Sequence, residues 1–373
     1  MEQKKMILLS GSGDTVAWFR LEFLNEFILR SYKVYVFAPG IRDDLKPQLE
    51  EMGVEFIEIK LDRKGFDVLN LVLSVIELRK LFKDIQPDII FSYTHKAILS
   101  GALAAKISGF SNIFSLITGT GHIFDGRTLK ERFIKNIGSL ALKLALKFNK
   151  LVFFQNIDDS NLFLKNNIAK PHQARLVNGS GVNLNKFLLT PLPSQPIFLC
   201  MARLIKSKGL MEFAKAAQEI KKSYPQARFL LYGYSDDHPD SIDEKEILDN
   251  WYEEYGIEYH GYAANPIDAI KLCSVFVLLS YKEGTPRVVL EAMAMGRPII
   301  TTDAPGCRET VKHNINGFLV PPFQYMEAVH AMEALLNERL RSEMGSQSRK
   351  YCESKFNVTD VNRILLSEMD VIR

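Results

Sequence analysis

The sequence predicts an α/β protein made of two Rossmann-like domains, each built around a parallel sheet with helices on both faces. Two observations lead to this prediction. Short apolar runs alternate with amphipathic stretches along the whole chain, and a chain of 373 residues is longer than a single domain usually is. A hydrophobic content of 47% and a charged content of 24% are those of an ordinary globular protein, which excludes disorder, collagen and coiled coil as overall descriptions.

Strands are predicted at the short apolar runs, because parallel strands covered on both faces are apolar along their whole length. In the first domain these runs are residues 5–10, 33–38, 55–59, 88–92, 113–117, 151–155 and 175–178, with helical patterns such as 18–30 and 68–84 between them. In the second domain they are residues 197–202, 228–232, 275–280 and 298–301. Helical segments between successive strands are what a parallel sheet needs for its crossover connections.

The linker between the domains is predicted at residues 190–196, which contain three prolines in seven residues. Proline lacks a backbone N–H and resists both helix and central strand. The first domain is therefore expected to span residues 1–190 and the second residues 191–373. One more amphipathic helix is predicted at residues 359–372, and its apolar face can pack on either domain.

Cysteine and hydropathy patterns restrict the compartment and the chemistry. The four cysteines lack paired metal-ligand spacing and are too few to hold together a secreted scaffold; they are Cys200, Cys273, Cys307 and Cys352. The apolar run 6–9 is too short for the core of a signal peptide, and no stretch reaches the roughly 18 apolar residues of a membrane span. We expect a cytoplasmic protein without a transmembrane segment and without a metal centre.

The two halves of the chain differ in charge. Residues 1–190 hold 26 lysines and arginines against 19 aspartates and glutamates, whereas the remainder holds 21 against 25. The positive excess of the first half favours an anionic partner. Nucleic acid, acidic lipid headgroups and phosphorylated substrates all fit this charge.

A candidate anion site lies where the buried strand at 275–280 ends and a new helix begins. Pro286 has the φ of a first helical turn and lacks an N–H that would be unpaired there, so the helix is expected to start near it. Gly284 lets a ligand approach the backbone closely. The first turn, at Arg287, directs backbone N–H groups and the positive end of the helix dipole at whatever binds above the sheet. A diphosphate is the natural occupant.

Three charged side chains near this edge each have two interpretations. Glu291 sits in a helix that is apolar nearly all round, so its carboxylate needs a partner. That partner is either Arg287, four residues earlier, or a ligand hydroxyl such as that of ribose. Arg203 and Lys208 follow the first strand of the second half, at the edge where open sheets bind ligands. They either neutralise phosphate or are solvated loop charges.

Together these segments resemble the retaining family-four glycosyltransferases, in which two Rossmann-like domains face each other across a cleft in the GT-B fold. The most specific match is residues 283–298, which look like the family's signature of two glutamates separated by seven residues, here Glu283 and Glu291. Residues 178–182, 305–309 and 316–321 match other segments of the family. The resemblance covers most of the chain and implies a hexosyltransferase with a nucleotide-sugar donor.

The resemblance also assigns roles to single residues. Arg203 and Lys208 would hold the donor diphosphate, Glu291 would bind the ribose hydroxyls, and Glu283 would lie beside the donor sugar. Glu283, Arg203 and Lys208 are therefore the expected catalytic residues. The donor pocket would be completed by four consecutive residues at the start of the helix, namely Gly284, Thr285, Pro286 and Arg287.

Candidate residues in the first half belong to less specific patterns. Gly13 lies in a glycine turn after the first strand that can bring N–H groups to the donor phosphates, although a plain tight turn fits as well. Residues 92–96 and 116–121 resemble a subgroup that extends saccharides on polyprenyl-diphosphate carriers, including bacterial N-acetylhexosamine transferases. His95, His122 and Thr118 are candidate contacts for the acceptor or the sugar, with an ordinary surface or core role as the alternative for the histidines.

Residues 127–150 form a basic amphipathic segment, with seven lysines and arginines, one glutamate and apolar residues between them. Such a helix can lie in an anionic membrane interface, and it can equally be a domain helix with a solvated lysine face. A lipid-linked acceptor favours the membrane interpretation. The protein would then be peripheral on the inner face of the cell membrane.

The expected reaction moves a sugar from a nucleotide diphosphate, expected to be UDP, to a lipid-linked saccharide in bacterial glycan, capsule or O-antigen assembly. By the resemblance it retains the configuration at the anomeric carbon. No metal or other cofactor is expected, and nucleic acid is not expected as a partner. The alternatives are a nucleotide-sugar epimerase and a non-catalytic protein that binds anions.

Overall fold

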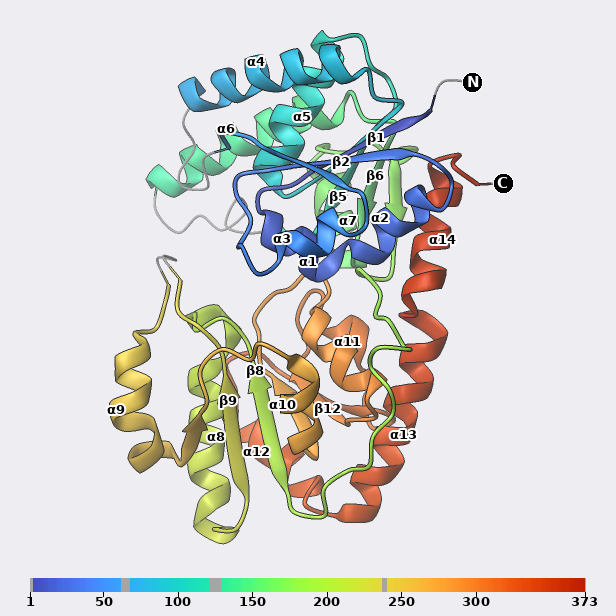
Figure 1. Cartoon of the computed structure of the whole chain (residues 1–373). Helices are drawn as coiled ribbons and strands as arrows, with labels where there is room; N and C mark the ends of the chain where they lie inside the picture. The colour runs from blue at the N-terminus through green and yellow to red at the C-terminus, as the bar shows by residue number, and fades with distance from the viewer. Residues whose placement is uncertain (1–2, 62–67, 121–128, 237–239, 373) are drawn as a thin grey trace. The chain divides into compact units, whose positions relative to one another are not determined.

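The computed structural model describes residues 3–61, 68–120, 129–236 and 240–372, with the backbone alone described for residues 129–136. The chain forms two compact units (Figure 1). The first consists of Met1–Ser180 together with Val361–Arg373, and the second of Gly181–Asp360. Each unit has its own parallel sheet with helices packed on it, which confirms the predicted fold class.

The first unit is built on a parallel sheet with the strand order β3-β2-β1-β4-β5-β6-β7. All its strands lie at predicted runs: β1 (Lys5–Leu9), β2 (Lys33–Ala38), β3 (Glu55–Glu58), β4 (Ile89–Tyr93), β5 (Ile113–Ile117), β6 (Leu151–Phe154) and β7 (Ala174–Leu176). In β1, Met6 and Leu8 pack in one apolar core, while Ile7 and Leu9 pack in the core on the other face. Both faces are therefore buried, which is why the strand is apolar throughout.

Helices cover both faces of this sheet. On one face, α5 (His95–Ile107) contacts both α4 (Val68–Ile85) and α6 (Leu129–Leu146) (Figure 1). The other face is covered by α1 (Gly13–Phe19), α2 (Leu21–Ile28) and α3 (Lys46–Glu50), and α7 (Ile157–Lys165) packs beside β6 and β7. Among the residues described, no helix combines the length and the apolar character needed to cross a bilayer.

The helical pattern predicted at 18–30 is two helices, because the chain leaves helical geometry at Arg20, where φ is −129°. Arg20 is buried, and its guanidinium lies 5.2 Å from the centre of the Tyr93 ring. The interruption places Arg20 against Tyr93 of β4, and helical periodicity does not reveal it.

The helix predicted near the C-terminus is α14 (Val358–Glu368), and it packs on the first unit. Val361, Leu365 and Leu366 are buried in the same core as Met6 of β1. Two ion pairs support this position, from Arg175 to Glu368 at 2.6 Å and from Lys150 to Asp370 at 2.7 Å. The sequence allowed this helix to pack on either domain, and in the structure it packs on the first.

The second unit contains a parallel sheet in the order β10-β9-β8-β11-β12-β13. Its strands are β8 (Ile197–Met201), β9 (Arg228–Tyr232), β10 (Ile257–Tyr259), β11 (Val275–Leu278), β12 (Ile299–Thr302) and β13 (Gly317–Val320). The helices around it are α8 (Leu210–Ser223), α9 (Glu244–Tyr255), α10 (Pro266–Leu272), α11 (Arg287–Ala294), α12 (Tyr325–Ala334) and α13 (Glu338–Lys355). The edge strands β10 and β13 were not among the predicted runs.

The proline-rich segment at 190–196 belongs to the second unit, and the two units divide at Ser180 and Gly181, ten residues before the predicted boundary. The fully buried Arg297 donates hydrogen bonds to the carbonyl oxygens of Thr190 at 2.8 Å and Pro191 at 3.3 Å. Arg341, also buried, donates to the carbonyl oxygen of Ser194 at 2.7 Å. Prolines remove N–H donors but leave carbonyl acceptors, and these two guanidinium groups tie the acceptors to the second unit.

Candidate active site

The candidate site lies in the second unit, at the carboxyl ends of the adjacent strands β8, β11 and β12. After β8 the chain passes Arg203 and forms a short 3-10 helix, η2 (Lys206–Lys208), before α8. After β11 it passes residues 281–286 and enters α11, and after β12 it makes a turn at Gly306. The parallel sheet thus brings three loops to one edge, where ligands of such folds bind.

Helix α11 begins as the sequence predicts. Pro286, with φ of −71°, occupies the position just before the first helical residue, Arg287. No side chain caps this start among the residues described. Residues 289–294 are all buried, so the dipole of α11 acts in a region of low dielectric. A partial positive charge therefore lies beside the loop that contains Gly284 and Thr285.

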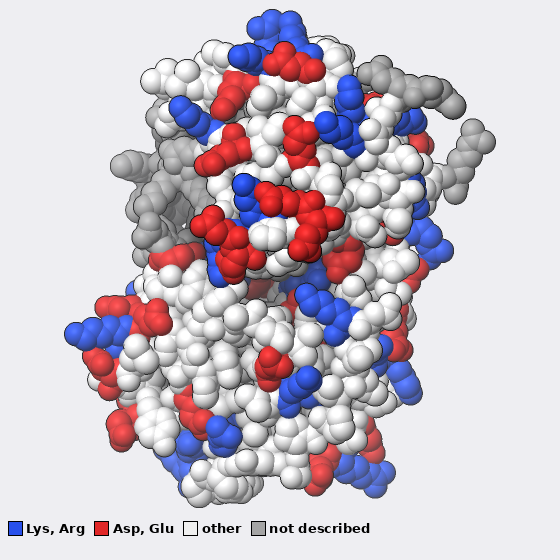
Figure 2. All heavy atoms as spheres, viewed as in Figure 1, with Lys and Arg blue, Asp and Glu red and all other residues white. Residues whose placement is uncertain are grey.

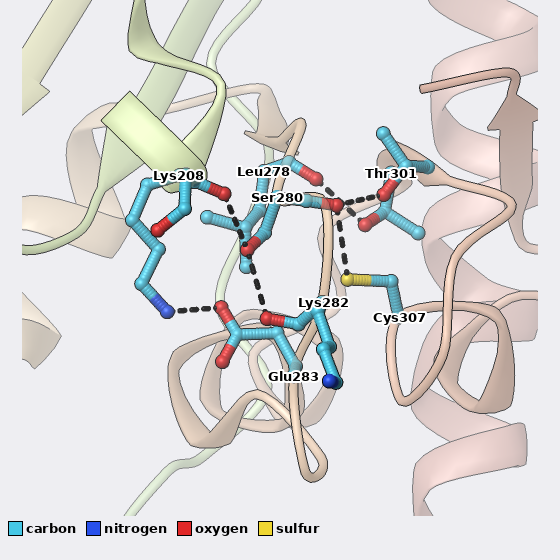
Figure 3. Close-up of polar contacts among 9 residues, drawn as sticks. Lys208, Leu278, Ser280, Lys282, Glu283, Thr301 and Cys307 are labelled. Carbon is cyan, nitrogen blue, oxygen red and sulfur yellow. Dashed lines mark hydrogen bonds and ion pairs between the residues drawn. The ribbon is translucent and has the colours of Figure 1, made fainter. Parts of the chain in front are cut away.

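Lys208 and Glu283 form an ion pair, although 75 positions separate them in the sequence (Figure 3). The lysine Nζ lies 2.5 Å from Oε1 of the glutamate, and the two side chains are only 15% and 16% exposed. Glu283 is fixed from its backbone as well, because its N–H donates to the carbonyl oxygen of Pro305 at 2.9 Å. A partly desolvated cation and carboxylate are thus held together near the start of α11.

Glu291 pairs with Arg287, at 3.2 Å between Oε1 and Nε, with both side chains about nine-tenths buried. The structure therefore has the intrahelical ion pair that is one of the two interpretations of Glu291. The ribose-binding role remains a prediction, because the same carboxylate can accept further hydrogen bonds.

Arg203 is the most exposed of the predicted donor-binding cations, and it pairs with Asp236 at 2.9 Å. No motif in the sequence marks Asp236 as a site residue. It follows β9, and β9 lies next to β8 in the sheet, which brings the two loops together. Knowledge of the strand order would have been needed to find this pair.

A set of hydroxyl groups near the ion pair joins the loops (Figure 3). The Ser280 hydroxyl lies within hydrogen-bond distance of two carbonyl oxygens, Ser207 at 3.2 Å and Lys282 at 3.3 Å. Thr302 donates its hydroxyl proton to the carbonyl oxygen of Ser280, and Thr301 donates to that of Leu278 at 2.6 Å. These short side chains connect the Lys208 loop to the Glu283 loop and to β12, and the sequence analysis missed all of them.

The thiols of this unit are buried and chemically inert. Burial raises the pKa to about 12 for each of Cys200, Cys273, Cys307 and Cys352, so almost no thiolate exists at neutral pH. The described residues contain no cluster of histidine, cysteine and carboxylate side chains that could hold a metal ion.

We predict that all four cysteines resist a thiol reagent such as DTNB in the native protein at pH 8. The folded protein should react only at the rate at which it opens, because the reactive form is the thiolate and the thiols are covered. Absorbance measured with and without denaturant checks this, with four equivalents released after unfolding. Rapid release from the native protein would contradict the burial of these side chains.

The predicted contacts in the first unit lie at the carboxyl edge of its own sheet. Gly13 begins α1, and a Cβ atom added there would lie 2.5 Å from the carbonyl oxygen of Gly40. Close backbone packing is therefore sufficient to explain this glycine, and its contact with donor phosphate remains a prediction. His122 lies outside the described residues.

Thr94, His95 and Thr118 follow the neighbouring strands β4 and β5. Thr94 has a φ of 71° with a ψ of 141°, a conformation that favours glycine and costs another residue about 1–3 kcal/mol. Its hydroxyl is buried and has no hydrogen-bond partner among the described residues. His95 is the first residue of α5. Backbone strain next to a buried polar group is typical of binding sites, and helical periodicity gives no sign of it.

Comparison with known proteins identifies the class. Residues 186–351 match the family described as Glycosyl transferases group 1, and residues 6–156 match the family described as Glycosyl transferase 4-like. These two segments cover most of the chain, so the molecule is a glycosyltransferase with the GT-B fold. It belongs to the glycosyltransferases that pair a 4-like N-terminal domain with a group 1 C-terminal domain.

Two curated relatives narrow the comparison. The N,N'-diacetylbacillosaminyl-diphospho-undecaprenol alpha-1,3-N-acetylgalactosaminyltransferase of Campylobacter jejuni is 28% identical over 89% of this chain and 90% of its own length. The UDP-Gal:alpha-D-GlcNAc-diphosphoundecaprenol alpha-1,3-galactosyltransferase of Escherichia coli is 23% identical over 79% of this chain and 78% of its own. Among solved structures, Anabaena HepE in complex with UDP aligns with a TM-score of 0.78 at 17% identity, over 99% of this chain and 100% of HepE. This last likeness supports the fold alone.

Proposed function

We propose that this glycosyltransferase moves a hexosyl group, such as an N-acetylhexosamine, from a UDP-linked donor to a saccharide carried on polyprenyl diphosphate, with retention at the anomeric carbon. The observation that carries the donor side is the pair of Lys208 and Glu283 beside the start of α11. The names of the C. jejuni and E. coli relatives, which specify saccharides on diphospho-undecaprenol, support the acceptor side.

The difficult step is the departure of the diphosphate. When the bond between C1 of the sugar and the phosphate oxygen breaks, negative charge grows on that phosphate. Lys208, Arg203 and the first turn of α11 then stabilise the growing charge. Because the nearby carboxylates hold these cations at the sheet edge before a donor arrives, little reorganisation is needed during the reaction. We propose that they suffice without a metal ion.

The acceptor hydroxyl forms the new bond to C1 on the face from which the diphosphate leaves, and its proton passes to the departing phosphate oxygen. When the donor phosphate draws Lys208 toward itself, Glu283 can accept hydrogen bonds from hydroxyls of the donor sugar. In the first unit, Thr94, His95 and Thr118 are the proposed contacts for the acceptor. The buried Thr94 hydroxyl, which has no hydrogen-bond partner in the described parts of the chain, supports this assignment.

The protein acts, by this proposal, on the inner face of the cell membrane. Residues 127–150 supply six net positive charges for acidic headgroups. In the described part of α6, Leu140, Lys143 and Leu144 are exposed, and so is Lys147 directly after the helix. An exposed surface that combines lysines with leucines fits an anionic interface better than it fits water alone.

A transfer assay tests the reaction. We expect a product one sugar longer only when a UDP-linked hexose or N-acetylhexosamine and an undecaprenyl-diphosphate-linked saccharide are both present. The new linkage should be α when the donor is α, by NMR, and EDTA should leave the rate unchanged. An epimer formed from the donor alone would indicate an epimerase, and donor binding without transfer would indicate a non-catalytic anion-binding protein.

A further inference from the structure

Helix α4 exposes an aliphatic surface that the proposed reaction does not use. Five side chains in its first half are each between 47% and 66% exposed, and they are Val68, Leu69, Val72, Leu73 and Ile76. No charged residue lies between Val68 and Ile76. The opposite side of the helix is buried, because Leu78 and Phe82 pack in the core of the sheet. Contiguous exposed aliphatic surface of this kind marks an interaction site.

The cations of α4 lie in its second half, where Arg79, Lys80 and Lys83 are exposed. Figure 2 shows the same division: the start of α4 is white, and charged atoms of both signs lie toward its other end. The helix is thus divided along its length into an aliphatic half and a charged half, in which Glu77 and Asp84 offset two of the three cations.

Helix α6 also exposes aliphatic side chains. Both α4 and α6 pack on α5, and in the described part of α6 the side chains of Ile137, Leu140 and Leu144 are 39–59% exposed. Each of these helices follows a parallel strand, so each begins at the carboxyl edge of the sheet (Figure 1). That edge also carries Thr94, His95 and Thr118. The aliphatic half of α4 therefore starts at the edge proposed for the acceptor.

We propose that the first half of α4 enters the hydrocarbon boundary of an anionic bilayer, with the lysines of α4 and α6 at the phosphates of the headgroups. This inference rests on the proposed function, since a lipid-linked acceptor is presented at such a surface. A second copy of the chain is the less suitable occupant. A two-fold symmetric contact would bring like cations together, whereas acidic lipid neutralises them.

Vesicle sedimentation tests the surface. The variant Leu69→Ser/Leu73→Ser removes two exposed side chains one turn apart, and Leu248→Ser/Tyr252→Ser is the matched control on α9, where the two side chains are 61% and 60% exposed. Two kinds of vesicle are compared, phosphatidylcholine alone and phosphatidylcholine mixed with phosphatidylglycerol. On the mixed vesicles, we expect the α4 variant to bind about tenfold or more weakly than the wild type. The control should bind like the wild type. Lys143→Gln/Lys147→Gln should weaken binding only to the vesicles that contain phosphatidylglycerol.

Equal binding of the wild type and the α4 variant would overturn the inference, and so would a wild type that binds neither kind of vesicle. A dimer that the α4 variant converts to a monomer without lipid, by light scattering, would instead assign the surface to a second copy. Transfer to a short-chain, water-soluble acceptor separates the two proposals. The α4 variant should keep wild-type turnover there, whereas absence of turnover in the wild type would count against the proposed function alone.

Discussion

Replacement of Lys208 by alanine should lower kcat for sugar transfer by roughly 100- to 1000-fold, the loss typical of a preorganised group that stabilises developing charge. Two effects add. The variant loses a cation beside the departing phosphate, and it leaves Glu283, which is 16% exposed, as a carboxylate that repels the same phosphate. Donor affinity should fall as well, because the repulsion acts before the bond breaks. Steady-state kinetics at varied donor concentration separate the loss of kcat from the loss of donor affinity.

The control is Lys206→Ala, because Lys206 lies in the same 3-10 helix and its side chain is exposed. That variant should keep its activity within about twofold, since an exposed surface charge contributes little. Lys208→Ala/Glu283→Gln should bind the donor more tightly than Lys208→Ala, because the unpaired charge is gone. Near-normal turnover of Lys208→Ala at saturating donor would remove Lys208 from the mechanism.

The strands could be predicted because burial on both faces leaves a simple signature. The central strands β1 and β11 are apolar at nearly every position, so they stand out from their surroundings. The strands that were missed, β10 and β13, lie at the edges of their sheet. An edge strand pairs with one neighbour only. Strand β10 carries Glu258 in its middle and β13 begins at Gly317, and both residues are uncommon in buried strands.

Without the family resemblance, the candidate site could be predicted only where its residues are neighbours in sequence. The loop from Glu283 to Arg287 and the helix that follows have a local pattern, and they lie where that pattern places them. The partner of Arg203 is Asp236, and the hydroxyl of Ser280 reaches the carbonyl of Ser207. These contacts depend on which strands are adjacent. Spacing along the chain does not contain that information.

The position of the last helix was undecidable for a different reason. The amphipathic face of α14 is satisfied by any apolar surface of suitable width, and both units have one. The choice is made by Val361, Leu365 and Leu366 in the core of the first sheet, together with two ion pairs to the same unit. No periodicity in the helix encodes these partners.

At Gly306 the turn after β12 packs against the backbone of the Glu283 loop more closely than a residue with a Cβ atom would permit. Its φ is 77°, and a Cβ atom added there would overlap the carbonyl oxygen of Glu283 and lie 2.5 Å from that of Gly284. Both atoms belong to the backbone, so no change of rotamer relieves the overlap. We expect Gly306→Ala to cost about 2–4 kcal/mol of unfolding free energy, from left-handed strain and overpacking together. The shifted glutamate should lower kcat/KM at least about 100-fold, because a displacement near 1 Å is enough for such a loss.

Gly53→Ala is the matched control, since Gly53 has a φ of 73° and an added Cβ would meet no atom within 4 Å. It has a similar positive φ but no nearby atom for the added Cβ to meet, so it should cost only about 1 kcal/mol and leave transfer intact. Denaturant unfolding and transfer kinetics are measured on both variants at a temperature where each is folded. Equal losses in the two variants would contradict the role of Gly306. A loss of transfer confined to folded Gly306→Ala must come from the displaced loop, because strain alone is present in both.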